Sequence, residues 1–171
     1  MKIKDMEGLF IHQLKDLYAA EKHILKALPK MAKAANHDDL RRAFEEDERV
    51  TEKQMERLES MFERMDVSAR GAKCPAIEGI LEEADELLHD EIEPHVLDAG
   101  LICAAQRVEH YEIAGYGCVR TLAQQLGKED IGKELQATLD EEKQANQKLN
   151  EIAVSHVNQE AVAAGHGESW K

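Results

Sequence analysis

The sequence has few basic residues for its length, and this shortage limits what the protein can bind. Its 171 residues include 22 lysines and arginines against 35 aspartates and glutamates, a formal net charge of −13. Nucleic acids and anionic membranes attract proteins through basic surfaces, and no lysine- or arginine-rich run offsets the acidic excess. We therefore expect neither nucleic acid nor a membrane surface as a partner.

Prolines, aromatic residues and long apolar runs are also scarce. Three prolines and 4% aromatic residues, beside 43% hydrophobic and 33% charged residues, favour helices over a β-sandwich. No run reaches the roughly eighteen apolar residues of a membrane span, and the opening MKIKDMEGLF lacks the apolar core of a signal peptide. The sequence predicts an all-α protein that is soluble and cytoplasmic.

Cysteines are few and odd in number. Cys74, Cys103 and Cys118 form neither a C-x-x-C motif nor the Cys/His spacing of a zinc site. We interpret them as structural thiols, with reactive or intermolecular thiols as the alternative.

What the sequence does contain is helical periodicity. Apolar residues recur at spacings of three and four over about residues 5–35, 38–65, 95–126 and 128–157, and a shorter helix covers 75–90. Short turns join the long helices in two pairs, whereas 66–94 is long enough to return along a bundle. This predicts a ferritin-like antiparallel four-helix bundle whose long crossover carries the fifth helix. We assign 1–160 to this domain and 161–171 to a mobile C-terminal tail.

A faint internal repeat supports two related hairpins. A shift of 91 residues places Glu21 on Glu112 and Leu40 on Ile131, so that apolar faces and turns coincide. Two such hairpins would pack about a pseudo-twofold axis.

Acidic residues interrupt the apolar face of each long helix. An unpaired buried carboxylate costs several kcal/mol, and no lysine or arginine shares these faces. Two divalent metal ions, iron or manganese, bridged by glutamates of opposing helices would supply the missing positive charge. The candidate metal ligands are Glu21, Asp47, Glu109, Glu112 and Glu142.

Hydrogen bonding is the alternative explanation for these residues. Tyrosine, threonine and asparagine side chains on the same faces, together with water, could satisfy the carboxylates without a metal. The usual Glu-x-x-His ligand pair is absent from 38–65 and 128–157, so oxygen ligands alone would form a hard site open to manganese as readily as iron. The sequence identifies no catalytic residue.

Three segments resemble the YciE/YciF family of bacterial stress proteins. They are the N-terminal MKIKDMEGLFIHQLKDLYAAEKHILKALPKMAKAA, the central AAQRVEHYEIAGYG and TLDEEKQANQKLNEIA. The resemblance covers nearly the whole chain except the tail. It implies a ferritin-like bundle, a homodimer, expression linked to stress, and an activity that has not been settled.

The chain departs from the family pattern within 38–65. Glu21, Glu109, Glu112 and Glu142 match the family's inward acidic positions, but the chain reads DERVT where the family reads like H-L-E-E-T. Asp47 thus replaces a histidine, and Arg49 and Val50 replace glutamates. Valine cannot bind a metal, so the resemblance does not establish a second metal position in this chain.

Two functional hypotheses follow. The first is a di-metal carboxylate protein that stores metal or handles peroxide or oxygen, with Tyr18 or Tyr116 beside the ligands. The second is a non-enzymatic helical homodimer that acts through protein contacts and keeps a vestigial acidic core. The many small residues in 95–126 favour close approach of another backbone, so we expect a homodimer with long exposed helix surface as its interface. Whether the protein is an enzyme, and on what substrate, stays open.

Overall fold

The computed structural model describes residues 3–70 and 73–165, and these form helices without any strand. The prediction of an all-α protein is therefore confirmed. The elements are α1 (Met6–Ala34), α2 (Asp38–Arg64), α3 (Pro75–His89), α4 (Pro94–Gln125), α5 (Glu129–Ile152), a π-helical turn (Ala153–Val157) and α6 (Asn158–Gly165).

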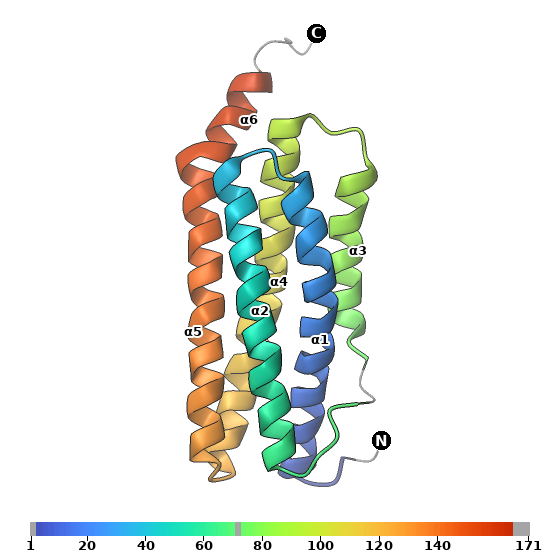
Figure 1. The fold of residues 1–171 in the computed structure, drawn as a ribbon, viewed down its shortest axis with the longest axis vertical. Coiled ribbons are helices and arrows are strands. Elements are labelled where there is room, and N and C mark those ends of the chain that lie inside the picture. Colours follow the sequence, from blue (N-terminus) through green and yellow to red (C-terminus); the bar gives the residue numbers. More distant parts are fainter. Residues whose placement is uncertain (1–2, 71–72, 166–171) are drawn as a thin grey trace.

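Four long antiparallel helices make up the bundle, as Figure 1 shows. α1 pairs with α2 and α4 with α5, while α1 also packs against α4 and α2 against α5. α3 lies against α1 and α4 within the crossover, and α4 starts at the end of the bundle where α1 finishes. The four-helix bundle with one long crossover is the predicted topology.

Local signals explain where the helices begin and end. The Asp5 side chain accepts a 2.7 Å hydrogen bond from the Gly8 backbone N–H and so caps α1. Pro75 and Pro94 lie in the first turns of α3 and α4, where a missing N–H costs nothing. Gly127, with φ of 70°, supplies the left-handed residue that separates α4 from α5.

Two apolar clusters occupy the two ends of the bundle. One contains Phe10, Leu14, Leu58 and Leu135, and the other contains Ile24, Leu28, Leu40, Phe44 and Leu101. On every long helix the residues between these clusters include a buried polar side chain. The polar layer therefore crosses the middle of the bundle, away from the helix ends.

The C-terminal region continues the helical structure. α6 extends to Gly165, so the first five residues of the predicted tail, 161–165, are helical, and 166–171 lie outside the described residues. The mobility of the tail stays a prediction. Within the described part of the chain, no helix is long and apolar enough to cross a membrane.

Candidate metal centre

Three glutamates from two helices meet at the centre of the polar layer. Glu109 and Glu112 lie three residues apart on one face of α4, and Glu142 faces them from α5. One carboxylate oxygen from each lies within 4.8 Å of the other two, and all three side chains are buried. The structure thus brings together three of the five predicted ligands, which we call the glutamate triad.

Glu21 joins this group from α1. Its side chain is completely buried, and the Tyr116 hydroxyl donates a hydrogen bond to its Oε1. The prediction that Tyr116 lies beside the acidic residues is therefore confirmed. Tyr18, the alternative candidate, instead donates to Glu59 over 2.5 Å in an exposed position, so of the two tyrosines it is Tyr116 that contacts these acids. The cause is its position on α1, on a face that turns toward α2 and solvent.

α2 contributes different chemistry from the other three helices. Thr51 and Gln54 are its buried polar residues in this layer. The Gln54 amide donates hydrogen bonds to Glu142 and, over 3.2 Å, to Glu141. Asp47 is only partly buried and belongs to the wall of a cavity, outside the triad. Gln54 was missed from the sequence, although its spacing from Asp47 places both on one helical face.

A second acidic residue on α5 is neutralised by an arginine. Arg57 donates two hydrogen bonds to Glu141, of 2.9 and 3.0 Å, and a third to the Thr138 hydroxyl. Burial alone would raise the pKa of Glu141, but the Arg57 and Gln54 hydrogen bonds outweigh it and lower that pKa. Arg57 therefore satisfies Glu141 and leaves the neighbouring triad without a cation.

The acidic residues of the layer have raised pKa values, because they are buried and no positive charge of the described residues fully compensates them. Burial raises the pKa of Glu21 to about 7, and burial followed by the charges of neighbouring acids raises the pKa values of Glu109, Glu112 and Glu142 well above the usual range. Burial also raises the pKa of Asp47 to about 7, although the charge of Lys148 opposes it. Without a cation, the layer must hold protons at neutral pH.

Unsatisfied oxygens support the same conclusion. Within the described residues, Glu21 Oε2, Glu109 Oε2 and Glu112 Oε1 are buried without a hydrogen-bond partner. Buried polar atoms normally find partners, because an unmade hydrogen bond costs about 1–3 kcal/mol. Carboxylate oxygens that point at one another suit a hard divalent cation, and the donor set therefore fits such an ion.

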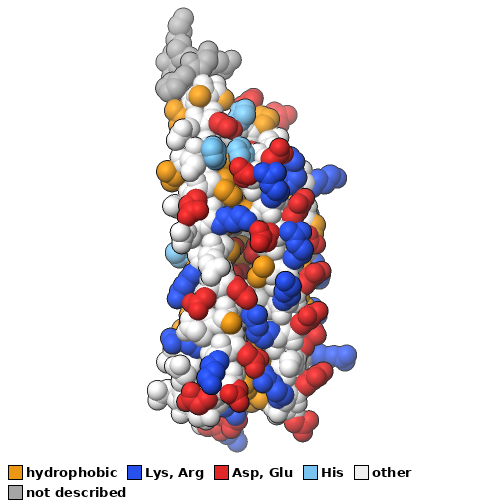
Figure 2. Space-filling view, turned by 60° about the vertical axis from the view of Figure 1, so that its left-hand side comes forward, with side chains coloured by type: hydrophobic (Ala, Val, Ile, Leu, Met, Phe, Trp, Pro, Cys, Tyr) orange, Lys and Arg blue, Asp and Glu red, His pale blue; other side chains and the backbone are white. Residues whose placement is uncertain are grey.

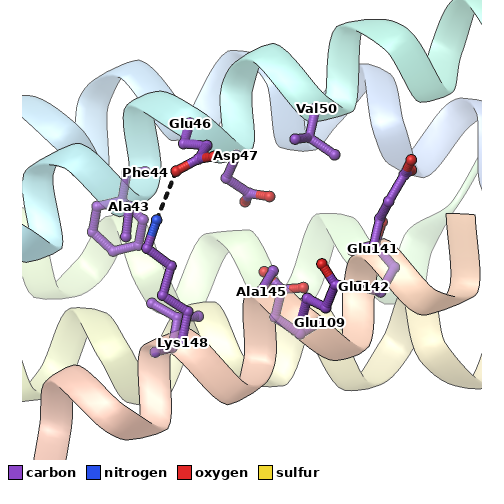
Figure 3. Close-up of a pocket in the computed structure, with 12 residues that line it drawn as sticks. Ala43, Phe44, Glu46, Asp47, Val50, Glu109, Glu141, Glu142, Ala145 and Lys148 are labelled. Atoms are coloured by element: carbon purple, nitrogen blue, oxygen red, sulfur yellow. Dashed lines mark hydrogen bonds and ion pairs between the residues drawn. The ribbon is translucent and has the colours of Figure 1, made fainter.

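A cavity connects this layer to the surface between α2 and α5. It has a volume of about 170 Å³, and Glu109 and Glu142 lie in its lining beside Asp47. Figure 2, which views this face, shows a recess partway along the molecule with acidic side chains in and around it. Figure 3 shows Asp47 on α2 pointing across the cavity toward Glu109 and Glu142, with Val50 and Ala145 in its walls.

Two positions in the cavity wall explain its size. Val50 and Ala145 each follow an acidic residue, Asp47 or Glu142, by three positions. Both side chains are short and apolar, so they offer no ligand atom and leave open space beside the glutamates.

Comparisons with known proteins agree with this architecture. A family model described as a domain of unknown function, DUF892, matches residues 5–162. Protein YciF of Escherichia coli strain K12 is 43% identical over 162 residues, which cover 94% of this chain and 98% of that protein.

Solved structures show the same similarity in three dimensions. The crystal structure of the E. coli stress protein YciF, 43% identical, superposes with a TM-score of 0.88 over 91% of this chain and 99% of its own. YcfI from Rhodopseudomonas palustris is 45% identical and superposes with a TM-score of 0.84, over 87% of this chain and 95% of its own. The Xanthomonas campestris protein XCC3681 shares the fold at 20% identity. Its TM-score is 0.72, over 95% of this chain and 97% of its own. The chain therefore belongs to the DUF892 family and is a homologue of the E. coli stress protein YciF.

Proposed function

We propose that this chain is a stress-associated, ferritin-like protein that binds iron or manganese at its mid-bundle carboxylates and uses the metal for storage or for handling peroxide or oxygen. The observation that carries the proposal is the glutamate triad, in which one buried oxygen of Glu109 and one of Glu112 lack a partner within the described residues. The ion pairs of the described residues include none of Glu21, Glu109, Glu112 and Glu142, so no lysine or arginine of the described part of the chain neutralises them.

The ligands divide unequally between two metal positions. The glutamate triad would hold one ion, and Glu21 with Glu112 would hold a second, with Glu112 shared between them. The buried polar residues of α2 are the neutral Thr51 and Gln54, so the second ion would bind more weakly. A bound redox-active metal would supply electron exchange with peroxide or oxygen, whereas manganese or iron held without turnover would amount to storage.

The protein's own residues would orient and shield such a centre. Gln54 holds Glu142 by a hydrogen bond, and the Tyr116 hydroxyl does the same for Glu21. These contacts limit the rotamers of the two carboxylates, as outer hydrogen bonds do in other metal sites. The two apolar clusters cover the layer on the sides that face the ends of the bundle.

Elemental analysis of wild type and Glu112→Gln tests the proposal. Glutamine keeps the shape of glutamate but loses the charge that balances a divalent ion, so we expect metal content to fall while the fold is kept. Glu45→Gln, an exposed change on α2, is the matched control and should bind as wild type does. The proposal is wrong if wild type and Glu112→Gln contain equal metal and added iron or manganese leaves the wild-type melting temperature unchanged.

The second candidate is a non-enzymatic homodimer that acts through protein contacts. It is favoured by the outer face of α4, because the only acidic residues between Ala99 and Gln125 are the buried Glu109 and Glu112. A face free of negative charge avoids like-charge repulsion in a protein of net charge −13. Light scattering at tens of micromolar tests association, and a clean monomer would rule out this candidate.

A further inference from the structure

We propose that the cavity between α2 and α5 is the route by which a divalent ion reaches the glutamate triad, and that Asp47 is a transfer residue on this route. The inference rests on the proposed function, since it concerns how the same carboxylates are filled. It assigns Asp47 a role different from that of a permanent ligand.

Burial makes a route necessary. Glu109 and Glu142 are only 2% and 3% exposed, so an ion in solution cannot reach them through the packed helices. The cavity volume of about 170 Å³ far exceeds the ~15 Å³ that one water needs, so a partly hydrated ion has room. Glu109 Oε2, which is buried without a partner in the described structure, belongs to a side chain in the cavity lining.

The other opening toward the layer is too small to compete. A cavity of about 10 Å³ touches Asp47 and Glu109 from the side of α1, α3 and α4. Its other walls are apolar, and they include Ile24, Leu28 and Leu81. This volume is at the lower limit for a single water, so a hydrated ion has no path there.

Asp47 has the position that a transfer residue requires. It is partly exposed, whereas the triad is buried, and it lines the cavity together with Glu109 and Glu142. Its carboxylate points across the open space in Figure 3. It is not among the oxygens that lie within 4.8 Å of one another. An ion held briefly by Asp47 would therefore still have to move inward to meet three carboxylates at once.

An ion pair stands at the entrance. Lys148 Nζ lies 2.7 Å from Glu46 Oε2, and both side chains line the cavity while remaining about half exposed. The lysine charge repels an approaching cation, and the glutamate partly cancels that repulsion. Removing the lysine charge should consequently speed the entry of a cation.

Mn²⁺ is the probe, and loss of the free-ion signal in electron paramagnetic resonance measures both uptake rate and final occupancy. Ala145→Leu and Val50→Phe narrow the cavity from opposite helices. We expect each to slow uptake about tenfold, a rise of about 1.4 kcal/mol in the barrier, with unchanged final occupancy. Ala137→Leu makes the same substitution on the solvent side of α5 and should leave the rate unchanged. Circular dichroism confirms that each variant is folded.

Charge variants test the transfer role. Asp47→Asn should slow uptake about fivefold and Lys148→Gln should speed it about threefold, because both change the potential met by the ion. Glu45→Gln is the control for loss of one exposed charge on α2. Wild-type rates in both narrowed variants would overturn the route, and a lower final occupancy in Asp47→Asn would make Asp47 a permanent ligand. A wild type that takes up neither Mn²⁺ nor iron would reject the proposed function as well, whereas full Mn²⁺ occupancy with unchanged rates rejects only the route.

Discussion

The two hairpins meet in the same layer of the bundle but supply it with different chemistry. The α4–α5 hairpin contributes the three acids of the glutamate triad, whereas the α1–α2 hairpin contributes Glu21, Thr51 and Gln54 as its fully buried polar residues there. Under the 91-residue repeat, Thr51 corresponds to Glu142, so a neutral residue stands where the other half has a charged one. One half concentrates negative charge, and the other provides hydrogen-bond donors that partly stabilise it.

This asymmetry has an energetic consequence. Gln54 and Tyr116 satisfy one oxygen each of Glu142 and Glu21, but hydrogen bonds from neutral donors do not cancel a charge. A bundle that carries such a layer is therefore more stable when a proton or a metal ion neutralises it. The following changes break or sharpen the difference between the hairpins, beginning with the largest expected effect.

Raising the pH should destabilise the metal-free protein. Burial raises the folded-state pKa of Glu21 from 4.5 to about 7. The stability that Glu21 adds to the folded protein is therefore fully present below pH 4.5 and is lost as the pH rises through 7. The pKa values of the glutamate triad are raised as well, so these acids act on stability in the same direction. We expect the melting temperature, measured in chelator, to be lower at pH 8 than at pH 5.5. Glu112→Gln should flatten this dependence, and a melting temperature that rises with pH would contradict the explanation.

Thr51→Glu would make the two halves more alike. A further buried carboxyl beside Glu21 and the glutamate triad has no cation to pair with, so we expect a loss of about 2 kcal/mol in the free energy of unfolding without metal. With excess Mn²⁺ the same change should strengthen the second metal position and recover that stability. Chemical denaturation with and without Mn²⁺ measures both effects. A variant that gains nothing from Mn²⁺ would show that Thr51 does not face the metal positions.

Two glycines of α4 distinguish packing between the hairpins from packing against another molecule. A Cβ at Gly115 would lie 2.6 Å from Leu17 Cδ2 on α1, so Gly115→Ala should cost about 1–2 kcal/mol through overpacking. Among the residues that the structure describes, none lies within 4 Å of a Cβ at Gly117. Gly117→Ala should therefore stabilise an isolated chain by up to about 1 kcal/mol through helix propensity. Thermal melting measures both variants. Destabilisation by Gly117→Ala that depends on protein concentration would instead place a second copy against this face.

Gln54→Leu should have the smallest effect. It removes the amide that donates to Glu141 and Glu142, but Arg57 continues to hold Glu141. We expect a loss of about 1 kcal/mol in urea denaturation, the usual contribution of one hydrogen bond. Gln136→Leu, which removes an exposed amide bonded to Asp140, is the matched control and should be close to neutral. Equal effects of the two substitutions would mean that Gln54 does not support the buried layer.

The helices and their order could be predicted because their signals are local. Asp5 caps α1, Gly127 separates α4 from α5, and Pro75 begins α3, each through the conformation of a few neighbouring residues. The predicted limits agree with the observed helices to within a few residues. The C-terminal end was harder to predict, because α6 has no sustained apolar face that would distinguish it from a mobile tail.

The inward direction of the acids was also visible in the sequence. Helical spacing places Glu109 and Glu112 on one face, and the structure confirms that Glu21, Glu109, Glu112 and Glu142 are buried. The small residues of α4 were interpreted as a sign of close helix approach. Gly115 does meet a neighbouring helix, but that helix is α1 of the same chain.

By itself, the sequence determined the all-α class, the four long helices with their crossover, and the faces on which the carboxylates lie, because periodicity and capping act within one helix. Only the tertiary structure decided which acids share a site. It separated Asp47 from the triad, paired Arg57 with Glu141, turned Tyr18 away and left a cavity beside Val50 and Ala145. The physical reason is that spacing along a helix defines direction, whereas distances between helices depend on their rotation and separation, which the packing of the whole bundle sets.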